Sequence, residues 1–219
     1  MKTSSFLDAL ESAFDEFPSD LRPRDPLFER ILEEVGGLAK PNNLALIAAA
    51  SSTLADGESY VEAGSLKGAS LIAAAHGKRG DFVGIDDFSM AAGSREQLAA
   101  NLSAFDCSHA TVIEGDVFEV LRDGSLGDRR VGVYYYDAAH GRQQTLAGLR
   151  LIEPYLSEES LLIVDDTDWE HVAEAVDDFL SSQPNAGELL RLRGKDHGTP
   201  AWWEGMRVLT WTAASDPAR

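Results

Sequence analysis

Acidic residues follow several apolar, strand-like runs of this chain, at the point where each run ends. They are Glu62, Asp86, Asp87, Asp116, Asp137, Asp165 and Asp166. Carboxylates are rare in protein cores unless they are paired or hold a ligand. In these positions they can accept hydrogen bonds from hydroxyl and amino groups, or bind a hard divalent cation through oxygen atoms. We therefore expect the chemistry of the chain at these strand ends.

One histidine lies close to these acids. His140 follows Asp137 by three residues, and the unperturbed pKa of imidazole lies near neutrality. His140 is therefore our candidate general base for removing the proton of a hydroxyl group, with Asp137 beside it in the catalytic site. The alternative is that His140 only orients a loop.

A glycine-containing segment, Gly64 to Gly68, follows the first strand-like run. Glycine lets a ligand approach the backbone closely. The segment fits neither the phosphate-binding loop nor the Gly-x-Gly-x-x-Gly fingerprint of dinucleotide-binding proteins, which disfavours a dehydrogenase. A glycine-containing turn preceded by an acid instead suits a ligand that carries an ammonium group and hydroxyls.

Hydrophobic patterning predicts the elements that position these residues. Apolar runs alternate with helical segments, which is typical of a parallel sheet covered by helices on both faces. The strands are expected at residues 59–62, 81–86, 110–114, 131–137, 160–165, 188–193 and 206–211. No helix separates the last two, so one strand should be antiparallel. The predicted fold is α/β, a doubly wound, mostly parallel seven-stranded sheet whose ligands bind beyond the carboxyl ends of the strands.

The first sixty residues are predicted to be helical, with apolar residues at helical spacing in 6–17, 27–35 and 42–54. We divide the chain into residues 1–57, a helical extension that serves as a cap or lid, and residues 58–219, which contain the sheet. Further helices are expected at 69–76, 95–104, 117–122, 145–155 and 169–180.

Composition limits the partners. The chain of 219 residues has 37 Asp and Glu against 19 Lys and Arg, a formal net charge of −18. That charge repels phosphate backbones, so we expect no nucleic-acid partner. No apolar window approaches the roughly 20 residues of a membrane span, and the one cysteine, Cys107, fits a reducing cytoplasm. The composition leaves open whether the chain forms a homo-oligomer.

Five segments resemble the motifs of class I S-adenosylmethionine-dependent methyltransferases, in the same order along the chain. They are residues 61–70, 82–88, 113–116, 136–140 and 164–169. The last two look like a small-molecule branch that includes macrocin-type sugar O-methyltransferases. The resemblance implies a Rossmann-like fold and methyl transfer from S-adenosylmethionine to a small molecule, on a hydroxyl of a sugar or natural product. The alternative is a non-catalytic cofactor-binding or assembly protein that retains the fold.

The resemblance also implies roles for individual residues. The cofactor-binding set is Glu62, Gly64, Ser65, Gly68, Ser70, Asp86, Asp87, Asp116 and Asp137. In this set Asp86 or Asp87 accepts the ribose hydroxyls, and Glu62 lies near the ammonium group or orders the loop. Asp116 either bonds the adenine amino group or caps the helix that begins at Val117, and both can hold together.

A magnesium site is implied at the ends of the fourth and fifth strands, held by Asp137, Asp165 and Asp166. The chain has Asp-Ala-Ala-His at residues 137–140, where some relatives have an Asp-x-Asp pair. The alternative is an acid cluster that caps helices. Trp202 and Trp203, in the last connection, form either a substrate wall or part of the core.

Overall fold

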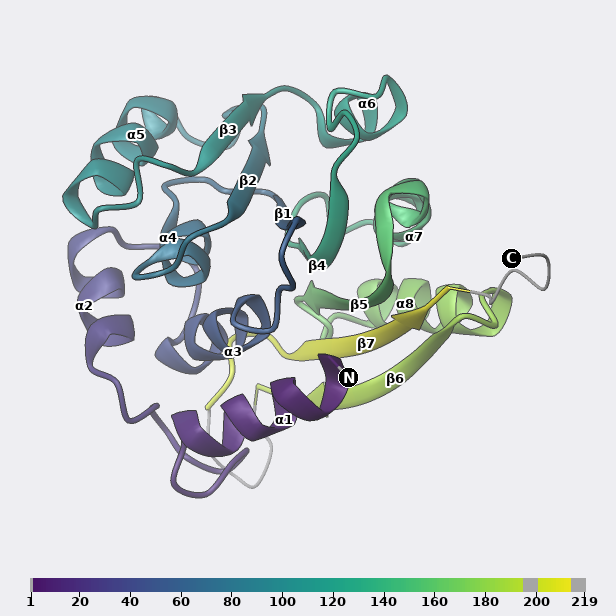
Figure 1. The fold of residues 1–219 in the computed structure, drawn as a ribbon, viewed down its shortest axis with the longest axis horizontal. Helices are drawn as coiled ribbons and strands as arrows, with labels where there is room; N and C mark the ends of the chain where they lie inside the picture. Colours follow the sequence, from purple (N-terminus) through teal and green to yellow (C-terminus); the bar gives the residue numbers. More distant parts are fainter. Residues whose placement is uncertain (1, 195–200, 214–219) are drawn as a thin grey trace.

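The computed structural model describes residues 2–194 and 201–213, and its centre is one seven-stranded sheet (Figure 1). The strands are β1 (Glu58–Ala63), β2 (Asp81–Asp86), β3 (Thr111–Glu114), β4 (Arg130–Tyr136), β5 (Leu156–Asp165), β6 (Ala186–Leu192) and β7 (Met206–Thr212). Their order is β3-β2-β1-β4-β5-β7-β6. Only β7 is antiparallel to its neighbours β5 and β6. This confirms the predicted α/β fold with one reversed strand.

Helices cover both faces of the sheet (Figure 1). The first layer is α1 (Lys2–Ala13), α2 (Leu27–Glu34), α3 (Pro41–Ser51), α4 (Ala69–Ala75) and α5 (Ser94–Ala104). The second is α6 (Val117–Arg122), α7 (Arg142–Leu151) and α8 (Glu170–Ser182). The predicted helix at 145–155 is wrong at both ends. It begins at Arg142 and stops at Leu151, and a 3-10 turn, Glu153–Tyr155, follows it. Pro154 in that turn cannot continue the helix.

Successive strand residues supply two hydrophobic cores, one on each face of the sheet. On β4, Val133 and Tyr135 belong to the core under α1–α5, and Tyr134 and Tyr136 to the core under α6–α8. This alternation is the two-residue period of a strand buried on both faces. The N-terminal helices add Phe6, Leu10 and Phe14 to the first core. Helix α1 contacts β5 and α3 contacts β4, whereas α2 packs mainly on α3 and α4.

Among the residues that the structure describes, no helix is both long and apolar enough to cross a membrane. The predicted last connection includes residues 195–200, which lie outside the described residues.

Candidate active site

A cavity of about 580 Å³ lies at the carboxyl ends of the parallel strands, where ligands of such sheets bind. Most of the predicted site residues line it: Gly64, Ser65, Ser70, Asp86, Asp87, Asp116, Asp137, His140 and Asp166. Glu62, Gly68 and Asp165 are not among the lining residues. The structure therefore brings nearly all of the predicted residues to one site.

The turn after β1 requires glycine because two strand ends approach closely there. Gly64 has φ +90°, and a Cβ on it would overlap the carbonyl oxygen of Asp137, after β4, and lie 2.8 Å from that carbonyl carbon. Hydrogen bonds fix the approach: the amide of Gly64 donates to Ile85 O (2.9 Å) and that of Asp137 to Ala63 O (2.9 Å). The sequence suggested that this glycine makes room for a ligand. In the structure it makes room for the neighbouring backbone. It also lines the cavity, so its role toward a ligand stays a prediction.

Asp86 shapes the same turn with its carboxylate. One oxygen accepts the amides of Ser65 (2.8 Å) and Leu66 (2.7 Å), and the other accepts that of Phe88 (2.6 Å). Asp87, next along the chain, is exposed at the cavity. Its Oδ1 accepts both the amide (2.9 Å) and the hydroxyl (2.7 Å) of Ser89. These hydrogen bonds keep the pKa of Asp87 below its usual value, so its second oxygen is left charged and available at the cavity.

Asp116 caps α6. Its Oδ1 accepts the amides of Phe118 (2.8 Å) and Glu119 (3.0 Å). This confirms the prediction that Asp116 is the N-cap of the helix that begins at Val117. Because one oxygen takes both amides and Asp116 also lines the cavity, the cap leaves the other carboxylate oxygen for a ligand.

Glu62 and Gly68 lie behind the cavity wall. Glu62 is fully buried, and the hydroxyl of Tyr60 donates to its Oε2 (2.8 Å). Burial raises the pKa of Glu62 to about 7, although the hydroxyls of Ser65, Tyr60 and Ser70 act in the opposite direction. Gly68 has φ +91° and is the N-cap residue of α4. Both residues are therefore part of the structure around the turn and do not line the cavity.

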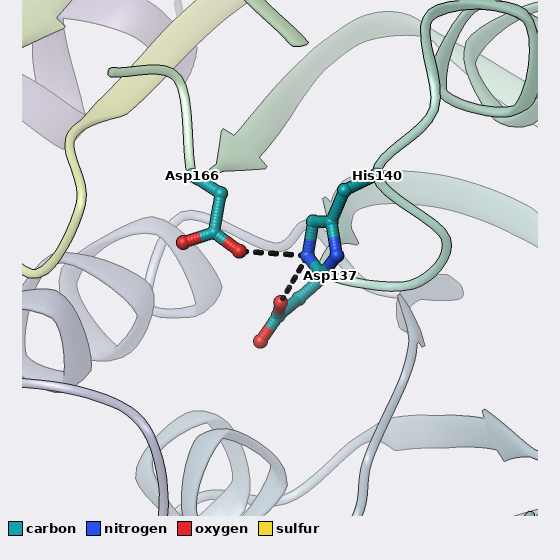
Figure 2. Close-up of side chains that lie close together, drawn as sticks. All are labelled: Asp137, His140 and Asp166. Atoms are coloured by element: carbon teal, nitrogen blue, oxygen red, sulfur yellow. Dashed lines mark ion pairs between the residues drawn. The ribbon is translucent and has the colours of Figure 1, made fainter. Parts of the chain in front are cut away.

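Three side chains converge at the ends of β4 and β5 (Figure 2). The Nε2 atom of His140 lies 2.7 Å from Asp166 Oδ2 and 3.6 Å from Asp137 Oδ1. One ligand atom from each of the three residues lies within 4.8 Å of the others. The carboxylates of Asp137 and Asp166 raise the pKa of His140 to about 10, against the opposing effect of burial. With no cation bound, the imidazole is therefore protonated at neutral pH.

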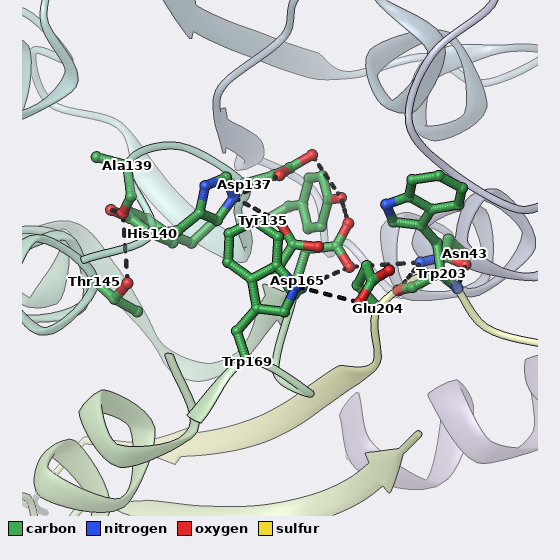
Figure 3. Close-up of polar contacts among 12 residues, drawn as sticks. Asn43, Tyr135, Asp137, Ala139, His140, Thr145, Asp165, Trp169, Trp203 and Glu204 are labelled. Carbon is green, nitrogen blue, oxygen red and sulfur yellow. Dashed lines mark hydrogen bonds and ion pairs between the residues drawn. The ribbon is translucent and has the colours of Figure 1, made fainter. Parts of the chain in front are cut away.

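Asp165 is not part of this cluster, and its carboxylate lies beside Tyr135 (Figure 3). Its Oδ2 accepts the hydroxyl of Tyr135 (2.6 Å), and its Oδ1 accepts the amide of Asp166 (3.0 Å). The same hydroxyl lies 3.1 Å from Asp137 Oδ2. Burial and the nearby charge of Asp137 raise the pKa of Asp165. The predicted cation ligands Asp137 and Asp166 are therefore together, His140 stands where Asp165 was expected, and Asp165 supports them through Tyr135.

The central part of the chain matches a known protein family. Residues 61–167 match the family model of a methyltransferase domain. Residues 61–167 therefore form a methyltransferase domain. This match confirms the resemblance that the five motifs indicated. A separate search against curated proteins gives no significant match.

Solved structures of methyltransferases share the fold around this domain. An O-methyltransferase from Bacillus cereus, solved with S-adenosylhomocysteine, is similar with a TM-score of 0.67 at 13% identity, over 97% of this chain and 100% of the other. TomG from Streptomyces achromogenes, an O-methyltransferase of tomaymycin synthesis solved with S-adenosylmethionine, gives 0.64 at 15% over 97% and 100%. CalS11, a TDP-rhamnose 3'-O-methyltransferase of calicheamicin biosynthesis, gives 0.58 at 21% over 97% and 94%.

The methyltransferase cavity also contains residues that the motifs did not indicate. Leu38, Met90 and Trp169 line its mouth, and all three are exposed. The ring of Trp169 lies 5.0 Å from that of His140. Trp203 lines the cavity, whereas Trp202 is buried against Phe14. The two tryptophans thus divide between the two predicted roles, wall and core.

The sequence analysis also missed a buried polar residue that contacts the site. Asn43 on α3 is fully buried; its Oδ1 accepts the amide of Trp203 (3.0 Å), and its Nδ2 lies 3.5 Å from Asp165 Oδ1 (Figure 3). The sequence carried a signal for this contact, because two asparagines stand in the first turn of an otherwise apolar helix, and buried amides require partners.

Proposed function

We propose that this protein transfers the methyl group of S-adenosylmethionine to a hydroxyl group of a small molecule. The observation that carries the proposal is that the Asp137–His140–Asp166 cluster opens into the same cavity as the turn after β1 and the free carboxylate oxygens of Asp87 and Asp116. A cofactor and an acceptor can therefore lie side by side in one cavity.

The cofactor would occupy the part of the cavity between the ends of β1, β2 and β3. The free oxygen of Asp87 would accept a ribose hydroxyl, and that of Asp116 would accept the adenine amino group. Asp86 holds the turn by its three amide contacts. When bound, the cofactor supplies a methyl group on an activated sulfonium. The protein then needs to align the acceptor oxygen and remove its proton.

The acceptor hydroxyl would lie beside the cluster at the ends of β4 and β5. The carboxylates of Asp137 and Asp166 raise the pKa of His140, which favours its protonated form and makes it a weaker candidate for a base acting alone. Two carboxylate oxygens and one imidazole nitrogen within 4.8 Å of one another do fit a divalent cation. The nitrogen ligand makes Mn²⁺ as suitable as Mg²⁺. Such a cation lowers the pKa of a bound hydroxyl.

The acceptor remains a sugar or natural-product hydroxyl in this proposal. Two of the similar structures are enzymes of natural-product synthesis, and one of them methylates a TDP-sugar, by their names. The formal charge of −18 disfavours a nucleic-acid acceptor.

Titration calorimetry with S-adenosylhomocysteine tests the cofactor site. We expect a dissociation constant in the micromolar range or below, which is a binding free energy of about −8 kcal/mol or more favourable. The Asp87→Ala variant should bind at least tenfold more weakly. Asp123→Ala is the matched control, because Asp123 makes the same pair of contacts, 2.9 and 2.6 Å, to Ser125 on an exposed loop outside the cavity. Lack of binding by the folded wild-type chain would refute the proposal.

A second experiment separates an enzyme from a protein that only binds cofactor. Methyl transfer from labelled S-adenosylmethionine to a panel of sugar and phenol acceptors should stop with a chelator and return with Mg²⁺ or Mn²⁺. Calorimetry with the metal alone should show binding that His140→Ala and Asp166→Asn weaken. Methyl transfer that continues at full rate in chelator would exclude the cation.

A further inference from the structure

A second cavity adjoins the proposed active site. It measures about 700 Å³, and Trp203 and Glu204 line both cavities. Strand β6 runs parallel to β5, because both are antiparallel to β7. The end of β6 therefore reaches the same edge of the sheet as the active site. Arg191 near that end and Arg193 just beyond it line the cavity.

Among the described residues that line this cavity, cations outnumber acids by three to two, although the chain as a whole is strongly acidic. Lys40, Arg191 and Arg193 line it. Arg191 and Arg193 are two residues apart, the spacing that puts strand side chains on one face. Lys40 is the N-cap residue of α3 and comes from the opposite end of the sequence. The helix end adds partial positive charge beside it.

The acids of the cavity are already engaged, whereas two of its cations are not. Asp168 accepts the amide of Gly194 (2.7 Å), and Glu204 accepts the indole N–H of Trp169 (3.2 Å). Within the described part of the chain, the side chains of Lys40 and Arg191 make no hydrogen bond or ion pair. Two such cations that face one cavity can bind an oxyanion through charge-assisted hydrogen bonds.

We propose that this second cavity is an anion subsite that holds a carboxylate or phosphate group of the methyl acceptor. The proposal rests on the proposed function, and it narrows the acceptor to an anionic molecule. Trp203 lies between the two sites, so the body of the acceptor would pack on its indole. The hydroxyl would then face Asp137, His140 and Asp166.

Calorimetric titration of the full chain, saturated with S-adenosylhomocysteine, tests the subsite with two probes, inorganic pyrophosphate for phosphate groups and malonate for carboxylates. We expect one of them to bind at a single site, and the double variant Lys40→Gln/Arg191→Gln to weaken it at least tenfold. The better probe tells which group the acceptor carries. Both side chains are partly or fully exposed, and circular dichroism checks that the variant folds.

The charge-matched control is Arg79→Gln/Arg122→Gln, since both arginines are exposed and line neither cavity. It should change the affinity less than twofold. Equal weakening by both double variants, or no binding of either probe to the wild type, would overturn the subsite. Loss of S-adenosylhomocysteine binding with retained anion binding would instead overturn the proposed function, so the two failures are distinguishable.

Discussion

Substitution of Gly64 by alanine tests whether contact between two strand ends, rather than ligand space, requires glycine after β1. The added methyl group would overlap the carbonyl oxygen of Asp137 and lie 2.8 Å from its carbon, at a backbone φ of +90°. The turn cannot move away easily. Amide hydrogen bonds of 2.9 Å tie Gly64 to β2 and Asp137 to β1.

The magnitude follows from two costs. A left-handed backbone conformation costs a residue with a Cβ about 1–2 kcal/mol. Overpacking against backbone adds about 1–3 kcal/mol. We therefore expect Gly64→Ala to lower the free energy of unfolding by about 2–5 kcal/mol. For a chain of this size, that lowers the melting temperature by at least about 4 °C.

Urea denaturation followed by circular dichroism measures this loss, and Gly57→Ala is its control. Gly57 has a similar φ of +79°, but a Cβ there would meet nothing within 4 Å. The Gly57→Ala variant should therefore lose only the cost of the left-handed backbone, about 1–2 kcal/mol of its free energy of unfolding. If Gly64→Ala is no less stable than Gly57→Ala, the close approach does not demand glycine, and the reasoning is refuted.

Three further predictions concern buried or paired groups. Tyr135→Phe removes a hydroxyl that lies between the buried carboxyl group of Asp165 and the partly exposed one of Asp137. It should lower the free energy of unfolding by about 1–3 kcal/mol in urea denaturation; an unchanged midpoint would contradict this. In metal-free protein, NMR titration should give His140 a pKa near 10, which Asp166→Asn lowers. Because folding raises this pKa, the ion pairs of His140 stabilise the protein fully below about pH 6.5 and lose that effect as the pH rises through 10. His140→Gln should therefore be less stable than the wild type at low pH and approach its stability above pH 10. Cys107 is fully buried and burial raises the pKa of its thiol to about 11, so it should react with a thiol reagent at pH 8 only after denaturation.

The fold could be predicted from the sequence because the signals for each helix and strand are local. The strand at Asp81–Asp86 and the helix at Val117–Arg122 have the predicted bounds. Their apolar runs, turn residues and caps lie within a few residues of one another. The position of the site followed too, since the carboxyl ends of parallel strands meet at one edge.

The contacts within the site could not be read in the same way, because they join residues distant in the sequence. Nothing near Asn43 indicates that its amide will meet Trp203, 160 residues later. The pairing of His140 with Asp166 depends on β4 and β5 being neighbours with a particular register. A residue pattern gives strand adjacency only as a general rule, without the register that sets which side chains meet.

The two consecutive acids at the end of β5 show how local geometry separates roles that the sequence makes look equal. Asp165 is the last residue of the strand and lies in its regular pleat, on the side of Tyr135. Asp166 leaves the strand with φ +55°, a conformation that aspartate adopts more readily than most residues. That change of backbone direction carries its carboxylate to His140 in the cavity. One acid therefore supports the site from within the core, and the other lines the cavity.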